Sequence, residues 1–331
     1  MGELRRNGPA IVAVGGGHGL SAILRGLKLY TNNLTAIVTV ADDGGGSGML
    51  REDLGIPPPG DIRNCMEALA GTESLMRRLL AYRFQDGRLA GQAFGNLLLA
   101  ALAGISDSFD QAVARMSQVL AISGRVLPVT NSNVRLEAVF ENGASVEGES
   151  KIFDFKKQQN CRIHHVRLLP EHPPALPEAL DAIRRADIVI LGPGSLYTSI
   201  IPNLLVDGVA EAIHDSKGLK IYVCNIMTQD GETEGMPAED HLAALLEHGE
   251  PGMVDICLCN SDPVGPDLLE RYSQEDAEPM QVDRRAIELL GAEVVFRPLM
   301  DQDCGYARHS GIKVAQAVLD LYEQRADTKI F

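Results

Sequence analysis

The stretch Ile11-Val12-Ala13-Val14-Gly15-Gly16-Gly17-His18-Gly19-Leu20-Ser21 decides the class of fold. Its first four residues are apolar without interruption, which is typical of a parallel strand buried on both faces. Four glycines in the next five positions form a turn, and the apolar spacing that follows predicts a helix over 20–30. A glycine turn between a strand and a helix presents free backbone N–H groups and the positive end of the helix dipole. The stretch therefore predicts a phosphate-binding turn in an α/β protein.

This turn differs from the two best-known phosphate-binding patterns. Leu20 stands where G-x-G-x-x-G has its third glycine, and no Gly-Lys-Ser/Thr follows as in a P-loop. The alternative is a tight turn without a ligand, but four glycines are more than such a turn requires. The candidate binding residues of the turn are Gly15, Gly16, Gly17, His18, Gly19 and Leu20.

Four further apolar runs have the character of the first and predict additional buried strands. They are residues 36–40, 188–191, 221–224 and 254–258. Helical patterns lie between the strands, at residues 65–69, 75–84, 94–103, 109–120, 175–185 and 241–247. This alternation predicts a Rossmann-like, doubly wound α/β fold, with a mainly parallel sheet and helices on both faces.

Two segments interrupt that rhythm. Residues 134–140 and 144–149 alternate apolar and polar side chains around Asn142-Gly143, which predicts an inserted β-hairpin that decorates the edge of the sheet. Residues 170–177 contain four prolines and are typical of a linker. We therefore expect one domain over 9–320, with two lobes over about 9–169 and 178–320.

Charge and hydropathy exclude several classes of partner. The chain has 331 residues, with 30 Lys and Arg against 45 Asp and Glu, and a formal net charge of −15. Such a charge repels nucleic-acid backbones and anionic lipids, so neither partner is expected. No apolar run approaches the roughly 20 residues that cross a bilayer, so we expect no membrane insertion. We expect a cytoplasmic location. Six cysteines are scattered with only Cys257 and Cys259 close together, which predicts neither a zinc site nor a disulfide framework.

Polar residues gather after the other predicted strands. Asp42 and Asp43 follow the second strand, where one acid could accept ribose hydroxyls and the other could hold a divalent cation. The remaining candidates lie in turns and helix starts, where each taken alone is more often a helix cap than a site. They are Ser47, Gly48, Asp61, Arg63, Asn64, Asn96, Gly192, Gly194, Ser195, Tyr197, Asn225, Thr228 and Gln229. Because the carboxyl ends of parallel strands share one edge, we expect these groups to converge there.

Six motifs in this order resemble the YvcK family of gluconeogenesis factors (UPF0052 type), in the superfamily of 2-phospho-L-lactate transferase, CofD. They are Gly-Gly-Gly-His-Gly-Leu-Ser (15–21), Ala-Asp-Asp-Gly-Gly-Gly-Ser-Gly (41–48), Pro-Pro-Gly-Asp-Ile-Arg-Asn (58–64), Phe-Gly-Asn (94–96), Gly-Pro-Gly-Ser-Leu-Tyr-Thr-Ser (192–199) and Asn-Ile-Met-Thr-Gln (225–229). The resemblance covers about residues 9–320. It implies a Rossmann-like fold, a role in growth and cell shape on gluconeogenic carbon sources, and binding of UDP-N-acetylglucosamine. It also implies that Tyr272 and Arg308 contribute to that binding.

Three positions depart from the family pattern. His18 replaces a threonine, Gly46 replaces a serine, and Gln92 replaces a histidine. Nucleotide binding through backbone N–H groups is expected to survive these changes, whereas a step that needs the missing side chains is not supported.

Two functions stay open at this point. The first is a sugar-nucleotide-binding regulator without turnover, which needs no cofactor for binding and which we favour. The second is a Mg²⁺-dependent transferase of the CofD type that uses a nucleoside diphosphate-linked donor, with Asp42 and Asp43 as catalytic residues and Asp43 as the metal ligand. A uridine or guanosine diphosphate compound is the expected ligand, and a homo-oligomer is the expected assembly.

Overall fold

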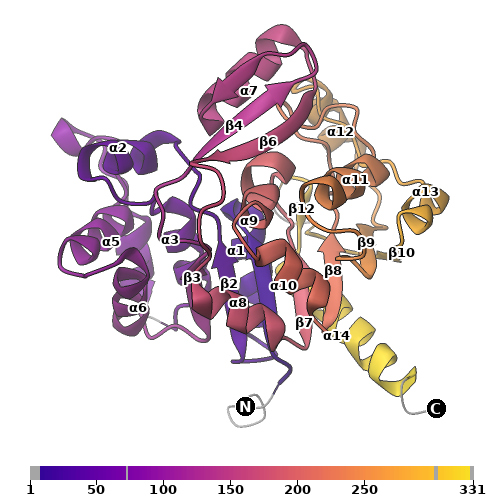
Figure 1. The fold of residues 1–331 in the computed structure, drawn as a ribbon, viewed down its shortest axis with the longest axis horizontal. Helices are drawn as coiled ribbons and strands as arrows, with labels where there is room; N and C mark the ends of the chain where they lie inside the picture. The colour runs from indigo at the N-terminus through magenta and orange to yellow at the C-terminus, as the bar shows by residue number, and fades with distance from the viewer. Residues whose placement is uncertain (1–7, 72–73, 302–304, 329–331) are drawn as a thin grey trace.

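The computed structural model describes residues 8–71, 74–301 and 305–328. Within them, the main sheet has seven strands in the order β10-β9-β8-β7-β1-β2-β3, and all neighbours run parallel (Figure 1). The strands are β1 Ile11–Gly15, β2 Leu34–Val38, β3 Arg125–Pro128, β7 Ile188–Leu191, β8 Leu219–Val223, β9 Ile256–Asn260 and β10 Glu293–Arg297. The predicted doubly wound α/β fold is therefore confirmed.

The inner strands are buried along their length, as uninterrupted apolar runs predict. All residues of β1, β2 and β7 are buried, whereas the outermost strands β3 and β10 each have exposed residues. Arg125 begins β3, and Glu293 and Arg297 bound β10. Those charged ends break the apolar run, which is why the sequence pattern missed both edge strands.

Helices cover both faces of the sheet (Figure 1). On one face, α1 (Gly17–Leu27) packs against both α3 (Gly60–Leu69) and α14 (Gly311–Thr328). On the other lie α8 (Pro177–Arg184), α9 (Ile201–Leu204), α10 (Val209–Asp215) and α11 (Ala238–His248). The other helices are α2 Gly45–Leu54, α4 Ser74–Ala81, α5 Phe94–Gly104, α6 Phe109–Val119, α7 Glu149–Gln159, α12 Pro266–Ser273 and α13 Arg284–Leu289.

The predicted hairpin exists, but it does not decorate the edge of the main sheet. Its strands β4 (Arg135–Phe140) and β5 (Ser145–Glu147) join β6 (Ile163–Leu169) in a separate antiparallel sheet of order β5-β4-β6. Alternate residues of β4 are buried, so one face of this small sheet joins the hydrophobic core that also contains the main sheet. In Figure 1 this sheet and α7 lie above the carboxyl edge of the main sheet, and Glu149, the first residue of α7, lines the cleft described below.

The order of the strands creates a topological switch point between β1 and β7. The chain passes from β1 outward to β2 and β3, and then returns to the other side of β1 with β7. The turns that follow β1 and β7 therefore lead away from each other, which opens a crevice at the carboxyl edge. Both halves of the chain contribute to this one sheet, and the division into two lobes stays a prediction. Among the described helices, none is both long and apolar enough to cross a membrane.

Candidate functional site

A cleft with a volume of about 750 Å³ lies at the switch point, among the predicted residues. Twelve predicted residues line it, although they come from segments far apart in the sequence. They are Gly17, His18, Gly19, Asp42, Asp61, Gly194, Ser195, Asn225, Thr228, Gln229, Tyr272 and Arg308. The carboxyl ends of four strands thus converge on one site, as expected for an open α/β sheet.

Two glycine turns meet at the centre of the cleft. The first opens α1, where Gly17 has a φ of +66°, a left-handed conformation that favours glycine. The second follows β7, and a Cβ on Gly19 would overlap the carbonyl oxygen of Pro193. Glycine at position 19 therefore allows the two turns to touch. The backbone N–H of Gly17, at the start of α1, donates to the carboxylate of Asp61, and both turns line the cleft.

Side chains from β7 and β8 hold the second turn in place. Ser195 Oγ donates a hydrogen bond to Gln229 Oε1 at 2.8 Å, and Asn225 Nδ2 donates to the carbonyl oxygen of Gly194 at 3.0 Å. Below the turn, Glu232 Oε1 accepts the backbone N–H groups of Tyr197 and Thr198. Burial raises the pKa of Glu232 to about 7. Tyr197 is thus a buried support for the turn and does not line the cleft.

One side of the cleft carries cationic groups. Arg25 of α1 and Arg308 of the short strand β12 (Arg308–His309) both line it. Burial, together with the charges of Arg308, Arg63 and Arg25, lowers the pKa of His18, so this imidazole is neutral near pH 7. Arg308 stacks on the ring of Tyr306 at 4.7 Å from guanidinium carbon to centroid, which orients an otherwise exposed side chain. An anionic group is favoured on this side.

Three acids, Asp42, Asp61 and Glu149, also line the cleft. Burial and the neighbouring charge of Asp61 raise the pKa of Asp42 to about 6. Burial raises the pKa of Asp61 and of Glu149 as well, and Asp42 and Asp61 add to the effect at Glu149. The three carboxyls therefore repel one another, and a cation or hydroxyl donors from a ligand would relieve this repulsion.

The other predicted residues lie in the supporting layer around the cleft. Asp43 turns toward α7, where its Oδ1 accepts both the N–H and the hydroxyl of Ser150. Arg63 pairs with Glu67 at 2.6 Å and donates to Asn64 at 2.8 Å. The predicted residues outside the cleft lining are Gly15, Gly16, Leu20, Asp43, Ser47, Gly48, Arg63, Asn64, Asn96, Gly192 and Tyr197.

Several lining residues were not predicted from the sequence. Arg25 lies in the last turn of α1, beyond the glycine motif, and Glu149 begins α7 after the hairpin, far along the chain from the first glycine turn. His309 follows Arg308, and burial lowers its pKa to about 4, so it is neutral. Its Nε2 atom is buried and has no hydrogen-bond partner among the described residues. A ligand in the cleft could supply that partner.

The acids fit a Mg²⁺ ion only if a ligand shares in holding it. In the described part of the chain, no three carboxylate oxygens of this cleft all lie within 4.8 Å of one another. Mg²⁺ commonly keeps several waters and takes one or two carboxylates plus ligand phosphates. Asp42 and Asp61 fit that pattern, since their mutual repulsion favours a cation.

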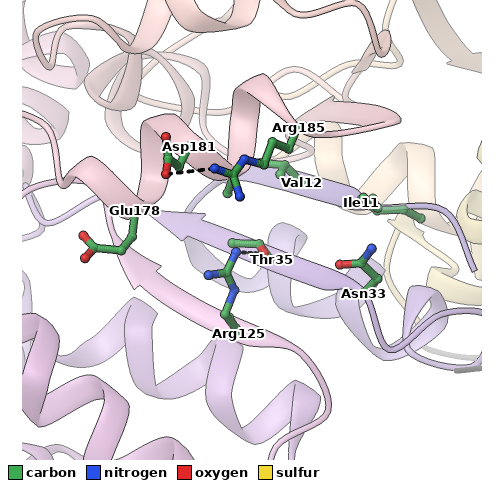
Figure 2. Close-up of a pocket in the computed structure, with 10 residues that line it drawn as sticks. Ile11, Val12, Asn33, Thr35, Arg125, Glu178, Asp181 and Arg185 are labelled. Carbon is green, nitrogen blue, oxygen red and sulfur yellow. Dashed lines mark hydrogen bonds and ion pairs between the residues drawn. The ribbon is translucent and has the colours of Figure 1, made fainter. Parts of the chain in front are cut away.

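A second hollow, of about 340 Å³, lies at the opposite edge of the sheet (Figure 2). It is lined by the first residues of β1, by Thr35 and by Arg125. Arg125 donates to Thr35, and Arg185 pairs with Asp181 at 3.6 Å. Both cations are therefore engaged, and this is the amino edge, where open α/β sheets do not place their ligand sites.

The fold, the cleft and the pattern of residues define a class of protein. Comparison with known proteins identifies that class. The chain belongs to the CofD family, because the family described as 2-phospho-L-lactate transferase CofD matches residues 11–300.

Within that family, its relatives are gluconeogenesis factors of the YvcK (UPF0052) type. It is 45% identical over 317 residues to the gluconeogenesis factor of Bacillus subtilis, a match that covers 96% of this chain and 99% of the relative. It is also 45% identical over 311 residues to the gluconeogenesis factor of Halalkalibacterium halodurans, covering 94% and 95% of the two chains. A crystal structure of a Bacillus halodurans protein superimposes with a TM-score of 0.91 at 44% identity, covering 95% of this chain and 100% of that one.

Proposed function

We propose that this chain binds a nucleoside diphosphate sugar, UDP-N-acetylglucosamine, in the switch-point cleft and acts as a sugar-nucleotide-dependent regulator. The process it regulates is growth and cell shape on gluconeogenic carbon sources, in keeping with the gluconeogenesis factors that it resembles. One observation carries the proposal: two glycine turns, from β1 and β7, meet in a cleft that Arg25 and Arg308 also line. Two turns and two guanidinium groups suit the two phosphates of a pyrophosphate.

The charged groups of the cleft suit the two ends of such a ligand. The pyrophosphate would lie against the glycine turns and the arginines, because positive charge and the helix dipole favour it there. Asp42 and Glu149 would accept hydrogen bonds from sugar or ribose hydroxyls. Tyr272 offers a ring face to a base or sugar, while its hydroxyl accepts the N–H of Ala307 at 3.2 Å.

Native mass spectrometry of the protein purified without added nucleotide tests this proposal. We expect a bound species with the mass of a uridine diphosphate sugar, and denaturation should release it for identification. A bound dinucleotide such as NAD would contradict the proposal.

A transferase of the CofD type is the second candidate, and the acidic side of the cleft favours it. In that case Asp42 would hold a Mg²⁺ ion that neutralises charge on the pyrophosphate, because Asp42 lines the cleft while Asp43 bonds to Ser150. The comparison of Asp42→Asn with Asp43→Asn tests this assignment. If Mg²⁺ tightens ligand binding to the wild type and to Asp43→Asn but not to Asp42→Asn, the transferase gains support. Ligand binding that is equally tight in EDTA would remove its main argument.

A further inference from the structure

Three buried thiols meet at the carboxyl ends of β8 and β9. Cys224 directly follows β8, and Cys257 and Cys259 lie in β9. Each side chain is at most 1% exposed, and the three Sγ atoms all lie within 4.8 Å of one another. The sequence spacing predicted no metal site here because the third thiol comes from a different strand.

The strand register accounts for the cluster. Tyr222 pairs with Cys257 and Val223 pairs with Leu258, so the next position after β8 lies opposite Cys259. Residues two apart on a strand share a face, which turns Cys257 and Cys259 to the same side. The geometry thus rests on two central strands of the sheet and does not depend on a loop.

The sulfur spacing matches a tetrahedral thiolate centre. The Sγ atoms of Cys257 and Cys259 are 3.7 Å apart. Two zinc–sulfur bonds of about 2.3 Å at a tetrahedral angle separate their sulfurs by about 3.8 Å. An ion could therefore enter with little movement of the side chains.

The surroundings of the cluster are both polar and accessible on one side. The hydroxyl of Tyr222 lies 3.2 Å from His241 Nδ1 and also hydrogen-bonds the side chain of Cys224. His241 is fully buried, and among the described residues its Nε2 has no partner. On the other side, Cys224 and Cys259 help to line a cavity of about 200 Å³, which also contains Asn260 and Asp262. The cavity leaves room for water or a small ligand beside the thiols.

We propose that Cys224, Cys257 and Cys259 bind a thiophilic divalent cation of the Zn²⁺ class, with three thiolate ligands and a fourth position open to this cavity. The ion forms three metal–sulfur bonds and displaces three thiol protons to solvent, and no group is oxidised or reduced. Three thiolates with a divalent ion have a net charge of −1. A monovalent ion would leave a net charge of −2, whose burial costs more free energy. Because Cys224 precedes Asn225, the ion would also fix the backbone that leads into the cleft.

Cobalt spectroscopy tests the site. Co²⁺ is titrated without oxygen into the fully reduced protein, and then Zn²⁺ is added. We expect sulfur-to-cobalt charge-transfer bands and strong visible d–d bands that saturate at one ion per chain and disappear with Zn²⁺. Cys257→Ser and Cys259→Ser should lose these bands, while Cys161→Ser, whose thiol lies outside the cluster, should keep them.

Two results would overturn the proposal. One is the absence of bands from wild type whose thiols are shown to be reduced, and the other is bands that persist in both β9 variants. If the variants do not fold, X-ray absorption of the Zn²⁺-loaded wild type decides the question. It should show three sulfur neighbours at about 2.3 Å, and a shell of nitrogen and oxygen alone would refute the site.

Discussion

At the scale of single residues, the cleft holds groups of both charges. Arg25 and Arg308 line it together with Asp42, Asp61 and Glu149, and the neutral His18 lies near the cations. A protein with a formal net charge of −15 can bind an anion beside these arginines, because their attraction is stronger than the screened repulsion from distant acids. Replacing an arginine and replacing an acid should therefore have different effects, on ligand affinity and on pH-dependent stability, which can be tested separately.

Replacing Arg308 with alanine should weaken binding of UDP-N-acetylglucosamine about tenfold or more. A hydrogen bond to a charged group contributes about 1.5–3 kcal/mol, and Arg308 is an exposed cation that lines the cleft. The melting temperature of the free protein should hardly change. Arg285→Ala, an exposed arginine of α13 outside the cleft, is the matched control. Equal affinity of both variants in calorimetry would exclude Arg308 from the site.

Asp42 should make the stability of the protein depend on pH. Its pKa is about 6 in the folded state against 3.8 ordinarily, so folding favours the protonated carboxyl. The contribution of Asp42 to the stability of the wild type therefore falls as the pH rises from 3.8 through about 6, and then stays level. Asp42→Asn removes this loss, which amounts to at most about 3 kcal/mol at about 1.4 kcal/mol per pKa unit.

Thermal unfolding of both proteins at pH 4.5 and pH 7.5 measures the effect. The melting temperature of Asp42→Asn relative to the wild type should be higher at pH 7.5 than at pH 4.5. A difference that is the same at both values would show that Asp42 ionises normally.

At the scale of elements, the site depends on the contact between the turn that opens α1 and the turn that follows β7. Gly19→Ala would push a methyl group into the carbonyl of Pro193 and force the two turns apart. We expect a destabilisation of about 1–3 kcal/mol, as for overpacking elsewhere, together with loss of nucleotide binding.

Gly104→Ala is the matched control for that change. Gly104 ends α5, has no neighbour within 4 Å of an added Cβ, and has no left-handed φ. This variant should have about the same free energy of unfolding and the same nucleotide affinity as the wild type. Chemical denaturation and calorimetry compare the two variants. If Gly19→Ala had the same stability and nucleotide affinity as Gly104→Ala, the contact between the two turns would not be needed for the site.

The elements also show what sequence can predict and where it stops. The uninterrupted run at 11–14 and the glycines after it predict β1, its turn and α1, because each signal is local. The direction of an individual side chain depends on tertiary contacts and not on local sequence. Two adjacent acids therefore have different surroundings: Asp42 lines the cleft, whereas Asp43 accepts a hydrogen bond from Ser150 of α7. Glu149 reaches the cleft only through the inserted sheet, so its role depends on how that sheet lies on the carboxyl edge. The meeting of Cys224 with the β9 thiols likewise depends on strand register.

At the scale of the whole molecule, one sheet joins both halves of the chain. β1 lies between β2 and β7, so the first half provides one glycine turn of the cleft and the second half provides the other. The C-terminal helix α14 returns to pack on α1, where the backbones at Gly26 and Gly311 approach so closely that a Cβ on either would clash. Neither half can form the cleft alone. The homo-oligomer expected from the sequence stays a prediction, which light scattering would test.

The central claim is that this switch-point cleft selects a nucleoside diphosphate sugar. Isothermal titration calorimetry of the ligand-free protein with UDP-N-acetylglucosamine, GDP and NAD, at one salt concentration and with Mg²⁺ present, tests it most directly. The account predicts that UDP-N-acetylglucosamine binds most tightly, with one site per chain, and that Gly19→Ala abolishes the heat of binding. Tightest binding of NAD, or unchanged binding of the sugar nucleotide to Gly19→Ala, would contradict it.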